Sequence, residues 1–144
     1  MTNSENMIKF FITMARAQSV LNNRFDRGLN GLSFTEFIIL YHLSQAKDRK
    51  MRRIDIADKI GFTASGVTRL LLPMEKIGLI KSGPTEDDAR VRTVVLASGG
   101  KKKLEEALER LELLGEEIIP EAEYPKLIAA SKLITEISGR ALMV

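Results

Sequence analysis

The stretch MRRIDIADKIGFTASGVTRLLLPMEKIGLI, residues 51–80, decides the fold because it encodes two short helices joined by a tight turn. The first helix is predicted from about Arg53 to Ile60. Its apolar positions are Ile54, Ile56, Ala57 and Ile60. Gly61 should end it, since glycine adopts the left-handed conformation that follows a helix at little steric cost. Phe62 is then expected to fill the corner, and the Thr63 hydroxyl to cap the second helix.

The second helix is amphipathic. Its buried stripe is predicted to be Val67, Leu70, Leu71, Met74 and Ile77. Pro73 predicts a kink, because proline removes one backbone hydrogen bond. Short or basic groups suited to a DNA major groove gather near the start of this helix: Thr63, Ser65, Gly66, Thr68 and Arg69. This pattern is typical of a helix-turn-helix, although an ordinary helical hairpin in an all-α core has the same periodicity.

The residues that follow favour the DNA-binding interpretation. Residues 81–90 are rich in turn-forming types and residues 91–96 are largely β-branched, so with residues 79–81 they predict a β-hairpin. Arg90 and Arg92 would share one face of the second strand. Guanidinium groups beside a recognition helix suit the narrow, negative minor groove.

Residues 33–103 resemble the winged helix-turn-helix of the MarR family of transcription regulators. The resemblance rests on Ile56-Ala57, Val67-Thr68-Arg69-Leu70, Glu75 to Ile80, Asp88-Ala89-Arg90 and Leu96 to Gly100. It implies that Arg90 enters the minor groove while Asp88 holds its geometry. Ala97 replaces the family's usual capping threonine, so Ser98 is expected to take over the cap and shift the helix start.

Composition and charge support a nucleic-acid partner. Residues 45–103 hold fourteen basic and seven acidic residues, a net charge of +7, whereas residues 104–144 carry −5. Five of the seven residues from Lys47 to Arg53 are basic, which is typical of phosphate contact, with Arg52 and Arg53 as candidates. A solvated charged loop is the alternative. The chain has no cysteine, which excludes disulfides, thiolate metal sites and a thiol redox switch.

The rest of the chain predicts further helices. They are expected over 5–28, from a capping box at Ser33 to Glu36, from about Ser98 to Ile118, and from Tyr124 to Ile137, with Gly139 ending the last. The expected fold is mainly α with a small β-hairpin. It is a single domain, 1–144, with a winged helix-turn-helix core at about 33–103, and dimerisation helices at 1–30 and 104–144. A dimer covers the wide apolar faces of these terminal helices; a monomer whose terminal helices close on each other is the alternative.

The sequence thus predicts a homodimeric repressor that binds a pseudo-palindromic duplex and releases it on binding a small aromatic or anionic effector. Candidate effector-pocket residues are Phe10, Arg16, Tyr41 and His42. The alternative function is a winged-helix module for protein contact or non-specific nucleic-acid binding without effector control. No cofactor, metal site or enzymatic activity is expected, because the lone histidine lies in an apolar helix and no phosphate loop or nucleophile motif appears. Without a signal pattern or long apolar run, the protein is expected to be cytoplasmic.

Overall fold

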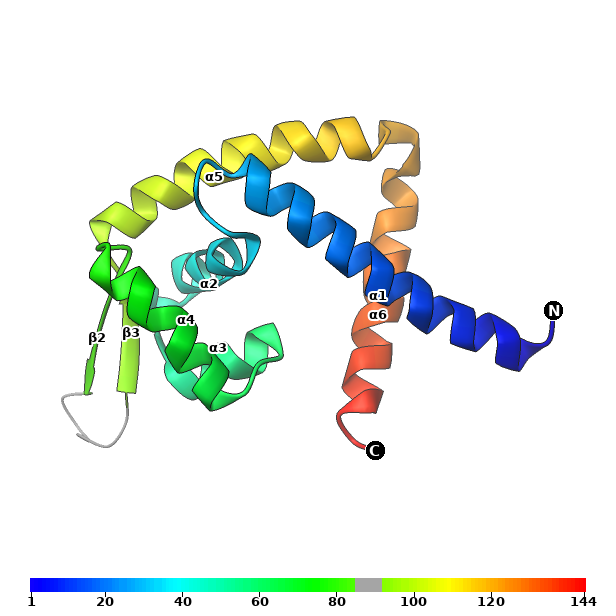
Figure 1. Cartoon of the computed structure of the whole chain (residues 1–144), viewed down its shortest axis with the longest axis horizontal. Coiled ribbons are helices and arrows are strands. Elements are labelled where there is room, and N and C mark those ends of the chain that lie inside the picture. The colour runs from blue at the N-terminus through cyan, green and yellow to red at the C-terminus, as the bar shows by residue number, and fades with distance from the viewer. Residues whose placement is uncertain (85–91) are drawn as a thin grey trace. The chain divides into compact units, whose positions relative to one another are not determined.

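The computed structural model describes residues 1–84 and 92–144, and these divide into two compact units, 1–111 and 112–144. The fold is mainly helical with a small three-stranded sheet (Figure 1). Its elements are α1 (Asn3–Gly28), α2 (Phe34–Gln45), η1 (Lys47–Arg49), β1 (Lys50–Arg52), α3 (Arg53–Ile60), α4 (Ala64–Lys76), β2 (Ile80–Pro84), β3 (Arg92–Leu96), α5 (Ser98–Ile118), η2 (Glu121–Glu123) and α6 (Tyr124–Ala141).

The sheet is antiparallel in the order β1-β3-β2. Ile80 pairs with Leu96 and Pro84 with Arg92, so β2 and β3 form the predicted hairpin. The sequence analysis missed β1, whose residue Met51 pairs with Val94. The short basic stretch before α3 is therefore partly a strand, and it attaches the helix-turn-helix to the hairpin.

The core lies in the first unit, where α2, α3, α4, the sheet and the start of α5 meet. Its fully buried side chains include Ile39, Leu40, Leu43, Ile56, Val67, Leu71, Met74, Ile80 and Val94. The apolar helix α2 lies at the centre, as predicted. The Ser33 capping box forms: Ser33 Oγ accepts from the Glu36 N–H at 3.1 Å, and Glu36 Oε1 accepts from the Ser33 N–H at 2.9 Å.

The helix-turn-helix forms at the predicted residues. Gly61 ends α3 with a φ of 72°, in the left-handed conformation, and α3 packs against α4 (Figure 1). Three side-chain predictions were wrong, because Ile54, Phe62 and Ile77 are exposed rather than buried. Ile77 follows the end of α4, so the helical period no longer directs its side chain toward the core.

Two helix-end predictions were also wrong. The cap of α5 does not shift: α5 begins at Ser98, and the Ala97 carbonyl accepts from the Lys101 N–H at 3.0 Å. Gly139 does not end α6, which continues to Ala141. Glycine costs only about 1 kcal/mol inside a helix, which is too little to stop α6.

Close packing holds the start of α5 against the segment between α4 and β2. A Cβ added to Gly99 would lie 2.8 Å from the Gly78 carbonyl oxygen, and one added to Gly100 would collide with the Leu79 carbonyl. The Leu79 carbonyl also accepts from the Ala97 N–H at 3.1 Å. Only glycine therefore fits at position 100 without displacing the backbone.

The second unit contains the end of α5, η2 and α6. Neither α6 nor α1 contributes a buried residue, although both carry apolar side chains. The most exposed of these on α6 is Ile128, at 77%. Among the described residues, no helix combines the length and the apolar character needed to cross a membrane.

Candidate nucleic-acid interface

The N-terminal turn of α4 presents its backbone and its short side chains at the surface. Thr63 Oγ1 accepts from the Gly66 N–H at 3.1 Å, which confirms the predicted cap. The Thr63 and Ser65 hydroxyls lie 3.3 Å apart, and both residues are exposed. A Cβ at Gly66 would lie 3.1 Å from Thr63 Oγ1, so a larger residue there would press on the cap.

Thr68 differs from its polar neighbours because its hydroxyl group both donates and accepts a hydrogen bond within the protein. Its proton is donated to the Ala64 carbonyl at 3.2 Å, and its oxygen accepts from Arg53 Nη1 at 3.5 Å. Arg53 is only half-exposed, and its buried Nε has no hydrogen-bond partner within the described part of the chain. The Arg53 side chain thus contacts Thr68 of α4. The two residues are far apart in the sequence, so no local sequence pattern predicts this contact.

Arg69 is exposed on α4, and the helix continues through Pro73 to Lys76. No hydrogen bond or salt bridge joins its guanidinium group to a side chain in residues 1–84 or 92–144. A planar group with paired donors on an exposed helix can bind the O6 and N7 acceptors of guanine.

The basic stretch before α3 is exposed, but one of its members is paired. Arg52 Nε donates to Asp55 Oδ2 at 2.9 Å, and Arg52 Nη2 donates to Asp55 Oδ1 at 3.1 Å. This two-point hydrogen bond lowers the pKa of Asp55 and raises the pKa of Arg52. Lys47, Arg49 and Lys50 are also exposed. Arg52 can therefore contact a phosphate only by sharing its charge with Asp55.

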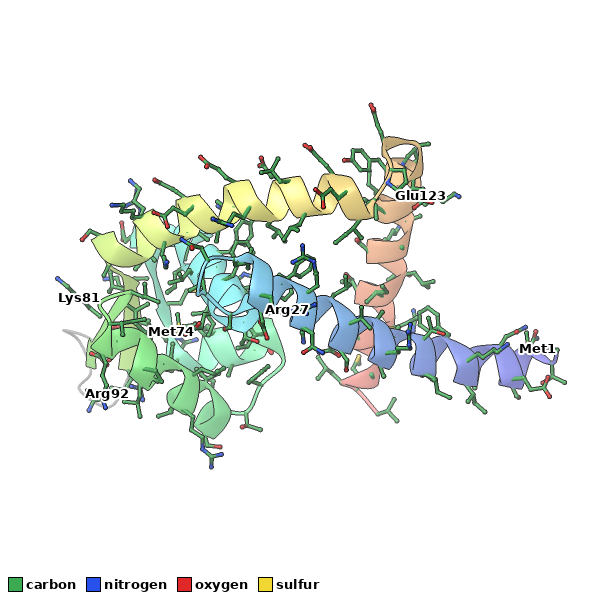
Figure 2. The ribbon with its side chains drawn as sticks, turned by 45° about the horizontal axis from the view of Figure 1, so that its top comes forward. Met1, Arg27, Met74, Lys81, Arg92 and Glu123 are labelled. Atoms are coloured by element: carbon green, nitrogen blue, oxygen red, sulfur yellow. The ribbon has the colours of Figure 1, made fainter. Side chains whose placement is uncertain are left out.

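The hairpin carries basic side chains beside the helix-turn-helix. Figure 2 shows Lys81 and Arg92 at the surface, whereas Met74 lies inside among core side chains. Glu75 ties α4 to β2, because its carboxylate accepts from the Ser82 hydroxyl at 2.7 Å and the Ser82 N–H at 3.3 Å. The predicted wing residues Asp88 and Arg90 lie outside the described residues.

The predicted effector residues lie on two helices, with Phe10 and Arg16 on α1 and Tyr41 and His42 on α2. Phe10 stacks edge-to-face on Phe11, Arg16 is exposed, and Tyr41 lies edge-on to the half-buried ring of His42. Burial, and secondly the charge of Lys59, lowers the pKa of His42.

A cavity of about 290 Å³ lies within the first unit, between α1, α2 and the end of α3. Its lining is Gln18, Asn22, Phe34, Thr35, Ile38, Lys59, Ile60 and Phe62. It combines an apolar floor with two amides and one ammonium group. No sequence pattern marks this convergence of three helices. In residues 1–84 and 92–144, no group of three or more metal-ligating side chains comes together.

Comparisons with known proteins agree with this architecture. The MarR family model matches residues 32–91. A segment of 73 residues is 29% identical to the HTH-type transcriptional regulator PapX of Escherichia coli; it spans 51% of this chain and less than half, 44%, of PapX.

Solved structures are similar over nearly the whole chain. The transcriptional regulator BldR from Sulfolobus solfataricus has a TM-score of 0.84 at 22% identity, covering 97% of this chain and 99% of BldR. Sco3205, a MarR family regulator from Streptomyces coelicolor solved in complex with DNA, has a TM-score of 0.83 at 19% identity, covering 99% of this chain and 93% of Sco3205. The family-model match over residues 32–91 and these solved structures together show that this chain has a MarR-like winged helix-turn-helix fold.

Proposed function

We propose that this protein is a transcriptional regulator that binds double-stranded DNA sequence-specifically as a homodimer. The observation that carries the proposal is the exposed start of α4, where Thr63, Ser65 and Arg69 lie outward from a fully buried inner face. The DNA-bound state of Sco3205, a protein of the same fold, supports it.

Each part of the surface has a chemical role in this proposal. Arg69 pairs with a guanine edge in the major groove, while Thr63, Ser65, Gly66 and Thr68 form the close-fitting surface around it. On the β2–β3 wing, Arg90 and Arg92 enter the adjacent minor groove, and Asp88 holds Arg90 in position.

The exposed basic residues before α3, Arg52 among them, supply affinity through phosphate neutralisation, and the half-exposed Arg53 at the start of α3 adds to it. Because the affinity gained from phosphate contacts comes from counterion release, DNA binding weakens as the salt concentration rises.

A homodimer accounts for the exposed apolar faces of the terminal helices. The exposed apolar side chains of α1 include Met7, Ile8, Phe11, Ile12 and Val20, and those of α6 include Leu127, Ile128, Leu133 and Ile134. Surfaces of this kind mark interfaces. A two-fold dimer presents two copies of α4 about one DNA turn (~34 Å) apart and therefore reads an inverted repeat.

The test is selection of bound duplexes from a random pool, followed by affinity measurements on the recovered sequence. We expect an inverted repeat. We expect Arg69→Ala to weaken its binding by roughly 1–3 kcal/mol and to relax preference at one base position per half-site. Arg110→Ala, which removes an exposed arginine from α5, is the matched control and should bind as the parent does.

Two results would contradict the proposal. Recovery of unrelated duplexes with equal affinity would indicate a non-specific module, and indifference to duplex DNA at low salt would indicate a protein-contact role.

The finer proposal is that the protein represses transcription and that a small anionic, partly apolar effector releases it. The cavity bounded by Lys59, Phe34 and Ile38 supports this, because its ammonium group and apolar floor suit such a molecule. A ligand there contacts α1, α2 and α3 together, so it can favour one arrangement of the helices over another.

This finer proposal can be tested by titrating operator-bound protein with salicylate, a phenolic anion. We expect lowered DNA affinity in the parent and a weaker response in Lys59→Gln. Lys126→Gln on α6, where the lysine is exposed, is the control for loss of one positive charge. If salicylate lowered the DNA affinity of both variants equally, Lys59 would not be part of the effector site. If salicylate changed the DNA affinity of none of the proteins, control by anions of this kind would be contradicted.

A further inference from the structure

The outer face of α4 carries an apolar group that neither the fold nor the proposed DNA contacts explain. Leu72 is 51% exposed, although it lies in the middle of the helix. At 100° per residue, Leu72 lies within about 60° of both Ser65 and Arg69 around the helix axis. It therefore shares the face that carries the exposed polar residues, not the face that enters the core.

The core does not need Leu72. Its neighbours Leu71 and Met74 are completely buried and fill the inner side of α4. Isolated exposed leucines are common on protein surfaces, so exposure alone has no meaning here. What gives Leu72 significance is its place, one turn beyond Arg69 on the same face.

Thr68 extends this apolar character toward the start of the helix. Its hydroxyl proton is held by the Ala64 carbonyl, and Arg53 donates to its oxygen. Thr68 therefore has no proton to donate to a base, and its methyl group is the part that can make a new contact. Residues four apart are neighbours on a helix, so the Thr68 methyl lies beside Leu72.

We infer that Leu72, with the Thr68 methyl beside it, recognises the 5-methyl group of a thymine in the major groove. Thymine is the one DNA base that presents an apolar group there. Three residues of α-helix span about 4.5 Å and one base step about 3.4 Å. The thymine therefore lies within about two base pairs of the guanine read by Arg69. This inference rests on the proposed function and names part of the sequence that the protein selects.

The experiment uses the full-length protein and the duplex recovered by selection. Each thymine is replaced in turn by deoxyuridine, which keeps base pairing and removes only the methyl group. At one thymine per half-site, near the guanine that responds to Arg69→Ala, we expect deoxyuridine to weaken parental binding about three- to tenfold, the effect of one lost methyl contact. Leu72→Ala should bind the thymine duplex correspondingly less tightly and should not respond to deoxyuridine at that position.

Ile77→Ala is the matched control, because Ile77 is 69% exposed but follows the end of α4 and so lies outside the helical face that Leu72 shares with Ser65 and Arg69. It should keep the full response to deoxyuridine. Two results would overturn this inference but not the proposed function. In the first, no thymine-to-deoxyuridine replacement weakens binding of the parent protein. In the second, deoxyuridine weakens binding of Leu72→Ala as much as it weakens binding of the parent. Failure to select any duplex would instead overturn the proposed function, and this inference with it.

Discussion

At the scale of single residues, Gly100 shows how one missing side chain permits a tertiary contact. Its Cα lies so close to the Leu79 carbonyl that an added Cβ has no room, and Leu96 Cδ1 would lie only 2.9 Å away. We expect Gly100→Ala to lower the free energy of unfolding by about 1–3 kcal/mol, since overpacking a dense site forces the backbone to shift. Urea denaturation followed by circular dichroism measures this.

Gly115→Ala provides the control in the same helix. Nothing lies within 4 Å of a Cβ built at Gly115, so this change should leave stability equal or raise it by up to about 1 kcal/mol. If both variants were destabilised equally, close packing specific to position 100 would not explain the Gly100 result, because helix propensity favours alanine over glycine at both positions.

His42 gives the stability of the protein a pH dependence of known sign. Burial, then the charge of Lys59, lowers its pKa in the folded state below the ordinary value of 6.5. The unfolded chain therefore binds a proton more readily, and stability falls as pH decreases through 6.5 toward the folded-state pKa. His42 is the only histidine, so denaturation midpoints measured from about pH 7.5 down to about pH 5 should report it. His42→Gln should flatten that slope, and an unchanged slope in the variant would assign it to other groups.

At the scale of elements, α4 is a helix that tolerates a proline in its interior. Pro73 cannot donate to the Arg69 carbonyl, yet α4 continues to Lys76 because Val67, Leu71 and Met74 anchor its inner face in the core. We expect Pro73→Ala to raise the free energy of unfolding by about 1–3 kcal/mol. Leu72→Ala, a half-exposed neighbour, should change it by less than about 0.5 kcal/mol. A destabilised Pro73→Ala would show that the ring itself makes needed contacts.

The elements also show which parts of the fold a sequence can predict. Helix α3 and the capped starts of α2 and α4 were predicted at the observed residues, because glycine, threonine and capping boxes act on nearby backbone. Strand β1 was missed because it is three residues long and exists only through pairing with β3, some forty residues away. The cavity was missed for the same reason. Local signals predict elements, whereas contacts between distant segments require the structure.

In the candidate interface, too, the features set by nearby residues were predictable and the contacts between distant residues were not. The Thr63 cap was predictable from its position before an amphipathic helix, and so was the exposure of Ser65 and Arg69 on the side opposite the apolar stripe. The engagement of the Thr68 hydroxyl by Arg53 was not predictable, since fifteen residues separate the two along the chain. That contact changes the chemistry Thr68 can offer from a hydroxyl donor to a methyl group.

At the scale of the whole molecule, the proposed function requires two copies of α4 on one duplex. Ile128 is the most exposed of the larger apolar residues on α6, at 77%. If α6 packs on its copy in a second subunit, Ile128→Glu places an unpaired carboxylate in that interface, which costs several kcal/mol per charge. We expect sedimentation to change from dimer to monomer at micromolar concentration, and affinity for an inverted repeat to fall by at least tenfold, because one half-site alone then holds each subunit.

Ile77→Glu introduces the same charge at a comparably exposed position between α4 and β2. It should remain dimeric, which separates interface loss from a general effect of a surface glutamate. An Ile128→Glu protein that stayed dimeric would exclude this face of α6 from the interface. A parent protein that sedimented as a monomer while still binding an inverted repeat would show instead that DNA alone brings the two subunits together.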